Sequence, residues 1–173
     1  ELWRETVVIV LSDHGEGFGL HRRRRHADVY EEITHVPLAV FVPGAAGQRI
    51  AAPTSTIYVF PWLLQRGTPA MRKAATDRLR THIGPMLQHT DGAIISELRC
   101  SDCARTAIAH PDQSLVYDFP SAYIELYDRA ADPDEQDNLF GRDAAHTTEP
   151  LRRLEGYLRV RAAGEAELEL TGP

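Results

Sequence analysis

Residues 7–16 have the sequence Val7-Val-Ile-Val-Leu-Ser-Asp-His-Gly-Glu16, an apolar run that ends in polar residues. A run of branched aliphatic residues predicts a strand buried on both faces, as in a parallel sheet covered by helices. Ligand sites in such sheets lie beyond the carboxyl ends of the strands. Asp13 and His14 follow this strand directly, and Gly15 allows a sharp turn behind them. The stretch therefore predicts an α/β fold with a metal site at the strand end.

A carboxylate beside an imidazole suits several divalent ions, and two ligands do not identify which ion binds. The alternative for Asp13 and His14 is an ordinary turn pair after a strand, where polar residues of this kind are common. The motif indicates a metal more firmly than it indicates which metal.

Further motifs follow in order along the chain. They are Gly15-Glu-Gly-Phe-Gly-Leu-His21, then His26, then Tyr30-Glu-Glu-Ile-Thr-His-Val-Pro-Leu38, and finally Glu125-Leu-Tyr-Asp-Arg-Ala-Ala-Asp-Pro-Asp-Glu-Gln-Asp-Asn-Leu139. In this order they resemble the sulfatase family of the alkaline-phosphatase superfamily, whose small carboxyl-terminal subdomain ends in a similar signature. Ordered motifs this far apart are hard to obtain by chance. The stretches 55–64 and 91–97 resemble a family helix and strand between them, so the resemblance covers nearly the whole chain.

The resemblance implies the edge of an alkaline-phosphatase-like parallel sheet domain, followed by a small antiparallel sheet subdomain with a carboxyl-terminal helix. We expect four regions: the carboxyl part of the large α/β domain at 1–66, a connecting helix at 67–90, the small α+β subdomain at 91–163 and a tail at 164–173. Patterning predicts a helix around 56–65, an amphipathic helix over 68–87 with a stripe at every fourth residue, four short strands within 93–127, and a last helix that opens at 148–150. The tail from Gly164 is predicted to fray.

Residue by residue, Asp13 and His14 fall on two metal ligands of the family motif, and calcium is the favoured ion, with manganese and zinc left open. His26 falls where sulfatases have a group that contacts the transferred sulfate. Its implied role is to stabilise charge or to protonate the leaving oxygen, and its alternative is an exposed loop histidine. His21 is assigned to substrate binding, with support of the loop as the alternative. Glu16 is expected to support the site from behind its ligands.

The run Arg22-Arg-Arg-Arg25 lies between the two histidines. Guanidinium groups there could bind an anionic sulfate or phosphate ester, so Arg22 and Arg25 are assigned to substrate binding. The alternative is a solvated charge run on a loop. Acidic residues within 132–137 lack the spacing of a calcium-binding EF-hand loop and are predicted to form a turn.

The family nucleophile, a formylglycine made in a Cys/Ser-x-Pro-x-Arg motif, has no counterpart in this chain. Cys100 and Cys103 lie in another context and are predicted to be ordinary thiols or a local disulfide rather than a redox or zinc site. The chain starts at Glu1 and reaches a core strand within a few residues. We therefore expect the carboxyl-terminal part of a longer protein, inactive alone, whose amino-terminal half supplies the formylglycine.

Three functions stay open. The first is hydrolysis of a sulfate ester. The second keeps the scaffold but hydrolyses phosphoryl or phosphonate esters or transfers phosphoethanolamine, because related members place a histidine at the position of His14. The third is a non-catalytic fragment that binds anions or a partner chain.

The net charge bears on the class of partner. The 19 basic and 25 acidic residues give a net charge of −6. This argues against nucleic acid as the main partner. No apolar run approaches the roughly 20 residues of a membrane span. The composition leaves a cytoplasmic, a periplasmic and a secreted location open.

Overall fold

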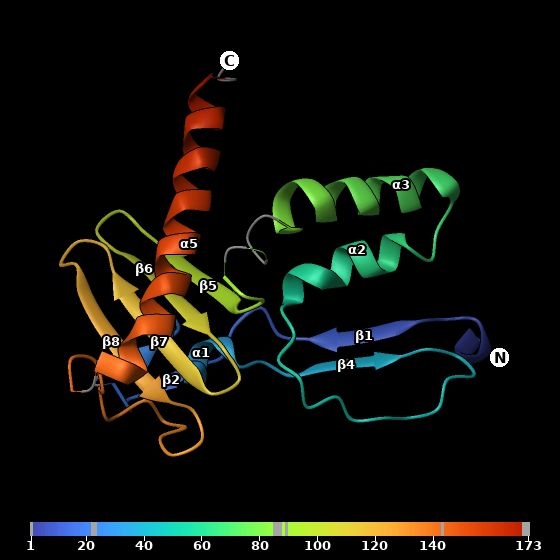
Figure 1. The fold of residues 1–173 in the computed structure, drawn as a ribbon. Coiled ribbons are helices and arrows are strands. Elements are labelled where there is room, and N and C mark those ends of the chain that lie inside the picture. The colour runs from blue at the N-terminus through green and yellow to red at the C-terminus, as the bar shows by residue number, and fades with distance from the viewer. Residues whose placement is uncertain (1, 22–23, 85–87, 89, 143, 171–173) are drawn as a thin grey trace.

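The computed structural model describes residues 2–21, 24–84, 88, 90–142 and 144–170 (Figure 1). Its amino-terminal part contains a short 3-10 helix, η1 (Leu2–Arg4), and a ribbon of two antiparallel strands, β1 (Val8–Leu11) and β4 (Leu38–Phe41). Two shorter strands, β2 (Gly17–Phe18) and β3 (Arg24–Arg25), form a second antiparallel pair. The strand predicted for the apolar run that begins at Val7 is therefore present.

The prediction that this strand is buried on both faces is wrong for this chain. Val10 is 60% exposed and Leu11 is 41% exposed. Pairing with β4 joins only the edges of the two strands, and within the described residues no layer buries the faces of this ribbon, since β4 is also exposed along its length. No parallel pair of strands is present in the described part of the chain.

Short helices connect the ribbon to the rest of the chain. Their bounds are α1 (Glu31–Thr34), η2 (Thr56–Tyr58), α2 (Val59–Leu64), α3 (Pro69–Arg78) and η3, a π-helical segment (Leu79–Ile83). The helix predicted around 56–65 is thus confirmed. Thr68 caps α3 by accepting a hydrogen bond from the Met71 N–H, and Pro69 fits the first turn because it has no N–H to leave unpaired. In the predicted stripe Ala75 is fully buried while Met71 is exposed.

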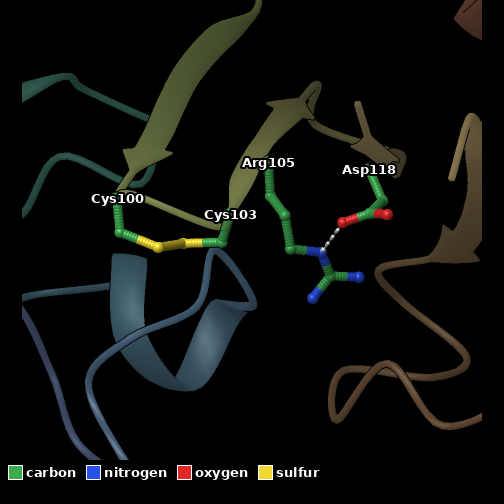
Figure 2. Close-up of a disulfide and its surroundings, with 4 residues drawn as sticks. All are labelled: Cys100, Cys103, Arg105 and Asp118. Atoms are coloured by element: carbon green, nitrogen blue, oxygen red, sulfur yellow. Dashed lines mark ion pairs between the residues drawn. A yellow bond between two sulfur atoms is a disulfide. The ribbon is translucent and has the colours of Figure 1, made fainter. Parts of the chain in front are cut away.

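The carboxyl-terminal half is built on a four-stranded antiparallel sheet in sequential order. Its strands are β5 (Ile94–Arg99), β6 (Ala104–Ala109), β7 (Gln113–Asp118) and β8 (Tyr123–Asp128). These confirm the predicted small antiparallel sheet. A disulfide joins Cys100 and Cys103 across the β5–β6 turn (Figure 2), and so the local disulfide is the correct one of the two alternatives for these cysteines.

A long helix, α5 (Ala144–Leu170), packs across one face of this sheet and extends beyond it (Figure 1). Leu154 and Tyr157 of α5 are buried against Ile108, Leu115 and Leu126. The helix begins earlier than predicted and continues to Leu170, into the tail that was expected to fray; the last three residues lie outside the described part of the chain.

Pro150 explains why the start of α5 was misplaced. A proline inside a helix leaves the carbonyl four residues earlier without its usual N–H donor. Here that carbonyl belongs to His146, and it accepts a hydrogen bond from the Gln113 side-chain amide at 3.4 Å. The sheet thus supplies a donor that the sequence pattern alone does not reveal, and the helix can extend ahead of the proline.

The opposite face of the sheet is covered by the segment that carries the Tyr-Glu-Glu motif. Val29 and Tyr30 are buried against Ala107, Val116 and Tyr127. The sheet is therefore a middle layer between α5 and the segment around α1, and this second contact holds the amino-terminal motifs against the small subdomain. None of the described helices is long and apolar enough to cross a membrane.

Candidate active site

The candidate site begins where β1 ends. Gly15 donates its N–H to the carbonyl oxygen of Ile33 at 2.6 Å, which ties the strand end to α1. A Cβ atom on Gly15 would lie 2.1 Å from the Glu32 carbonyl oxygen, so only glycine fits. This close approach fixes the position of the two residues just before it, Asp13 and His14.

His14 and Asp13 present one donor atom each to a shared space. The Nδ1 atom of His14 lies 2.8 Å from the Gly15 carbonyl oxygen. Because a carbonyl can only accept, the neutral ring carries its proton on Nδ1 and keeps the lone pair of Nε2. This Nε2 atom lies 3.8 Å from the Asp13 Oδ2 atom, a span that two ligands of one ion can have.

Both side chains are accessible, with exposed fractions of 88% for Asp13 and 42% for His14. The donor set therefore fits a divalent ion in type and in accessibility. It supplies fewer ligands than such ions require, and no group of three or more His, Cys, Asp or Glu side chains is arranged for a metal in the described residues.

His26 follows β3 directly and joins the same site. Its ring stacks on that of His14 with 4.2 Å between centroids and 22° between planes. Its Nδ1 atom lies 3.5 Å from a Glu16 carboxylate oxygen. The structure thus brings together three of the residues singled out by sequence, and it places Glu16 behind His26 rather than behind the two proposed ligands.

A cleft of about 400 Å³ contains this cluster. Asp13, His14 and His26 line one side of it. Residues 94–98 of β5 line another side, so the small antiparallel sheet contributes a wall to the site.

His21 lies apart from this cluster and is held by other groups. Its Nδ1 atom is 3.3 Å from the Glu32 carboxylate, its Nε2 atom is 2.8 Å from the Glu135 carbonyl oxygen, and its ring stacks on Tyr30 at 3.6 Å. Both ring nitrogens therefore have partners within the protein, and neither is left for a substrate. The geometry favours the alternative role, support of the loop, over substrate binding by His21.

The arginine run is only partly described. Arg22 lies outside the described residues, and so does the side chain of Arg25, whose backbone pairs with Gly17. Their assignment to substrate binding stays a prediction.

The acidic turn after β8 has a structural role. Asp128 accepts hydrogen bonds from the N–H groups of residues 130 and 131, and Asp132 accepts from those of residues 136 and 137. Asn138 accepts from the Leu126 and Phe140 N–H groups. The turn predicted for these residues is therefore confirmed.

Glu135 connects this turn to the amino-terminal motifs. It is 2% exposed, and one of its carboxylate oxygens accepts a hydrogen bond from the Glu31 N–H at 2.8 Å. Burial raises the pKa of the Glu135 carboxyl, although hydrogen bonds from Ser114 and Glu31 oppose the shift. Together with the His21 contact, this bond makes the two distant motifs one unit.

A buried network around Arg105 was missed at the sequence level. The Arg105 guanidinium bonds to Asp28, to Glu125 at 3.0 Å and to the Tyr30 hydroxyl at 3.2 Å, and the Tyr30 hydroxyl donates to Glu125 at 2.9 Å. Burial raises the pKa of Tyr30 to about 12, with Arg105 opposing and Glu125 adding to the shift, so the hydroxyl keeps its proton. Tyr30 and Glu125 begin two of the motifs quoted above, but Asp28 and Arg105 lie outside every motif, which is why spacing did not reveal the network.

Comparison with known proteins agrees with this geometry. Residues 1–67, the part that carries Asp13, His14 and His26, match the family model described as Sulfatase. Over these residues the chain resembles the sulfatase family. Its similarity to bovine arylsulfatase K is 28% identity over 178 residues, covering 94% of this chain and 33% of the relative.

Two further sulfatases, one compared by sequence and one by structure, are also similar to this chain. Delta 4,5-hexuronate-2-O-sulfatase of Bacteroides thetaiotaomicron is 27% identical over 149 residues, which cover 79% of this chain and 31% of that protein. The crystal structure of a candidate sulfatase from Bacteroides thetaiotaomicron superposes with a TM-score of 0.67 at 21% identity, over 94% of this chain and 38% of the other. The chain thus spans about a third of the length of the curated sulfatases it matches, and it shares their α/β fold.

Proposed function

We propose that this chain contributes the metal ligands and one substrate-contacting histidine to a site that hydrolyses sulfate esters. The observation that supports this most strongly is the cluster at the end of β1. The Asp13 carboxylate and the Nε2 atom of His14 share one space, and the ring of His26 stacks directly on His14. A sulfatase requires such a combination, because a metal and a proton donor must both reach one ester group.

Asp13 and His14 are the proposed ligands. The family resemblance favours calcium, and the imidazole nitrogen of His14 keeps manganese and zinc open. When bound, a divalent ion supplies electrostatic stabilisation of the negative charge on the sulfate. His14 contributes a fixed tautomer, because Gly15 holds its Nδ1 proton. Asp13 contributes negative charge at an exposed position, where an incoming ion meets little desolvation.

His26 is the proposed proton donor. Its Nδ1 atom faces Glu16, so its Nε2 atom is the one available to an ester oxygen in the cleft. A proton held at Nε2 can be transferred to the leaving oxygen when the ester bond breaks. The nucleophile, a formylglycine in this family, has to come from outside the printed sequence, which contains no Cys/Ser-x-Pro-x-Arg motif.

The amino-terminal half of a sulfatase domain is the proposed partner of this chain. Large apolar side chains stand exposed throughout the ribbon and the helices that follow it, a concentration typical of a surface that another part of the protein covers. They include Leu2, Trp3, Val10, Phe18, Val40, Phe41, Ile57 and Phe60. The chain also spans only about a third of the length of its curated relatives, which supports this proposal.

The substrate class is proposed from chemistry and from the relatives' names. One relative is named for the 2-O-sulfate of an unsaturated hexuronate, so sulfated sugars are the first natural substrates to examine. A phosphate ester is the main competitor, because histidine ligands also serve phosphoryl transfer.

The test uses the full-length protein that contains this chain, assayed with 4-nitrophenyl sulfate and 4-nitrophenyl phosphate. We expect sulfate hydrolysis, its loss in Asp13→Ala, and a fall of roughly a hundredfold or more in kcat for His26→Ala. Asp134→Ala and His110→Ala, which change the same residue types outside the cleft, should keep the activity. Hydrolysis of the phosphate ester alone would overturn the sulfatase assignment, and full activity in Asp13→Ala would overturn the site.

A further inference from the structure

We propose that Arg105 is a positioning residue of this site, which fixes Asp28 and through it the loop that carries His26. The inference rests on the proposed role of His26. Arg105 lies on β6 in the small carboxyl-terminal sheet and does not itself line the cleft. Its effect on the chemistry is therefore indirect, and it places part of the geometry of the site under the control of the small sheet.

Arg105 holds an unusual number of anionic partners for one guanidinium. Its three nitrogens face Asp28, Glu125 at 3.0 Å and Asp118 at 3.5 Å, and it also contacts the Tyr30 hydroxyl. Figure 2 shows the contact with Asp118 and the disulfide that closes the turn just ahead of Arg105. Such a set of contacts needs the planar fork of arginine, because an ammonium group is a single point of charge.

The Arg105 guanidinium stays positively charged despite its burial. Its side chain is 8% exposed, and burial alone would lower the pKa of the guanidinium. The hydrogen bond with Tyr30 and the carboxylates of Asp28 and Glu125 outweigh this, and the pKa lies above its ordinary value. A permanently charged anchor therefore faces Asp28 at every pH at which the protein is folded.

Asp28 connects the Arg105 guanidinium to the part of the cleft that contains His26. It lies two residues after His26, and it lines the same cleft as His14 and His26. Its Oδ1 atom bonds to Arg105 and also accepts the Val29 N–H at 2.9 Å, so side chain and backbone are fixed together. Val29 and Tyr30 are then buried against the sheet, which leaves the chain at His26 little freedom to shift.

A substitution that weakens the contacts of Arg105 should therefore displace His26 without unfolding the protein. A displacement of an ångström or less at a catalytic group lowers the rate while substrate binding through other groups persists. A merely structural arginine would instead change stability and leave the kinetics of the folded enzyme unchanged. These two expectations separate the proposal from its alternative.

The experiment compares Arg105→Lys with Arg153→Lys in the full-length protein. Arg153 is a suitable control because it is similarly buried, ion-paired with Asp91, and located on α5 at the opposite face of the sheet. With 4-nitrophenyl sulfate, Arg105→Lys should lower kcat roughly tenfold to a hundredfold while KM changes by less than about threefold. Arg153→Lys should leave both constants near those of the parent protein.

A double-mutant cycle tests the route through Asp28. If Arg105 acts through Asp28, the kcat of the Asp28→Asn, Arg105→Lys double variant should be close to that of the worse single variant, because the two changes remove the same constraint. Multiplicative losses would contradict this route.

Ring signals of His26 in protein labelled with 13C-histidine give a readout that does not depend on turnover. We expect them to move in Arg105→Lys and to stay in place in Arg153→Lys. Unmoved His26 signals, or an unchanged kcat in Arg105→Lys, would overturn the positioning role. If the parent protein hydrolyses no sulfate ester, the proposed function fails, and the ring signals still decide whether Arg105 positions His26.

Discussion

Gly15 shows how a single residue connects the sequence motif to the site. The turn after β1 brings its α-carbon against the backbone of Glu32, and no side chain fits in between. The sequence predicted that a glycine was needed for the exit from the strand. It could not predict the contact with Glu32, because that contact depends on where α1 lies.

Gly15→Ala should therefore destabilise the protein by about 2–4 kcal/mol, since the clash is with backbone that has to move as a whole. The measurement is the free energy of unfolding by denaturant. Gly47→Ala is the matched control, because a Cβ atom on Gly47 would meet no atom within 4 Å. Equal stability of the two variants would contradict the close packing at Gly15.

Glu135 offers a test by pH. Its raised pKa means that the folded state holds the carboxyl proton more tightly than the unfolded chain does, so the stability it contributes is present at acid pH and is lost as pH rises from about 4.5 through the raised value. Glutamine imitates the protonated form at every pH. We expect Glu135→Gln to gain stability relative to the parent protein between pH 4 and pH 7, as followed by denaturant unfolding across that range. A difference that is constant with pH would show that Glu135 is not perturbed.

At the scale of the elements, the sequence predicted the small sheet well. Its four strands alternate with turn residues, and β6, β7 and β8 each place alternate side chains against α5, which is the period that a strand pattern shows. The environment of β1 was predicted less well. An apolar run shows that a strand will be covered, but it does not show whether the covering layer belongs to the same stretch of chain.

The disulfide belongs to the β5–β6 turn and should stabilise it modestly. A loop as short as Cys100 to Cys103 restricts the unfolded chain by about 2 kcal/mol in the chain-entropy description. We expect the Cys100→Ser, Cys103→Ser double variant to lose no more than this amount of unfolding free energy and to keep the sheet by circular dichroism. Loss of the fold would show that the turn carries far more of the stability than its size implies.

The Cys100–Cys103 disulfide also predicts how these cysteines react with an alkylating agent. The protein isolated from an oxidising compartment should resist alkylation at both cysteines until it is reduced, because disulfides persist in such compartments. Immediate alkylation of Cys100 and Cys103 without reductant, followed by mass spectrometry, would contradict the bond.

At the scale of the whole molecule, the chain has one well-covered half and one uncovered half. The sheet lies between α5 and the segment around Tyr30, and its motifs meet through Glu135 and Arg105. The ribbon and the helices near it keep a broad apolar surface. The sequence resemblance predicted both halves and the site at the end of β1. It could not predict the Arg105 network, which forms only when segments distant in sequence fold together.

The most direct test of the account is equilibrium binding of a divalent metal to the full-length protein and to its Asp13→Asn variant, measured by calorimetry with calcium and checked by elemental analysis after dialysis. Asparagine keeps the size of the side chain and removes the charge. We expect the parent protein to retain the ion and Asp13→Asn to bind it at least about tenfold more weakly, while the exposed control Asp134→Asn binds as the parent does. Equal affinity in the parent and in Asp13→Asn would contradict the claim that this strand end holds the metal.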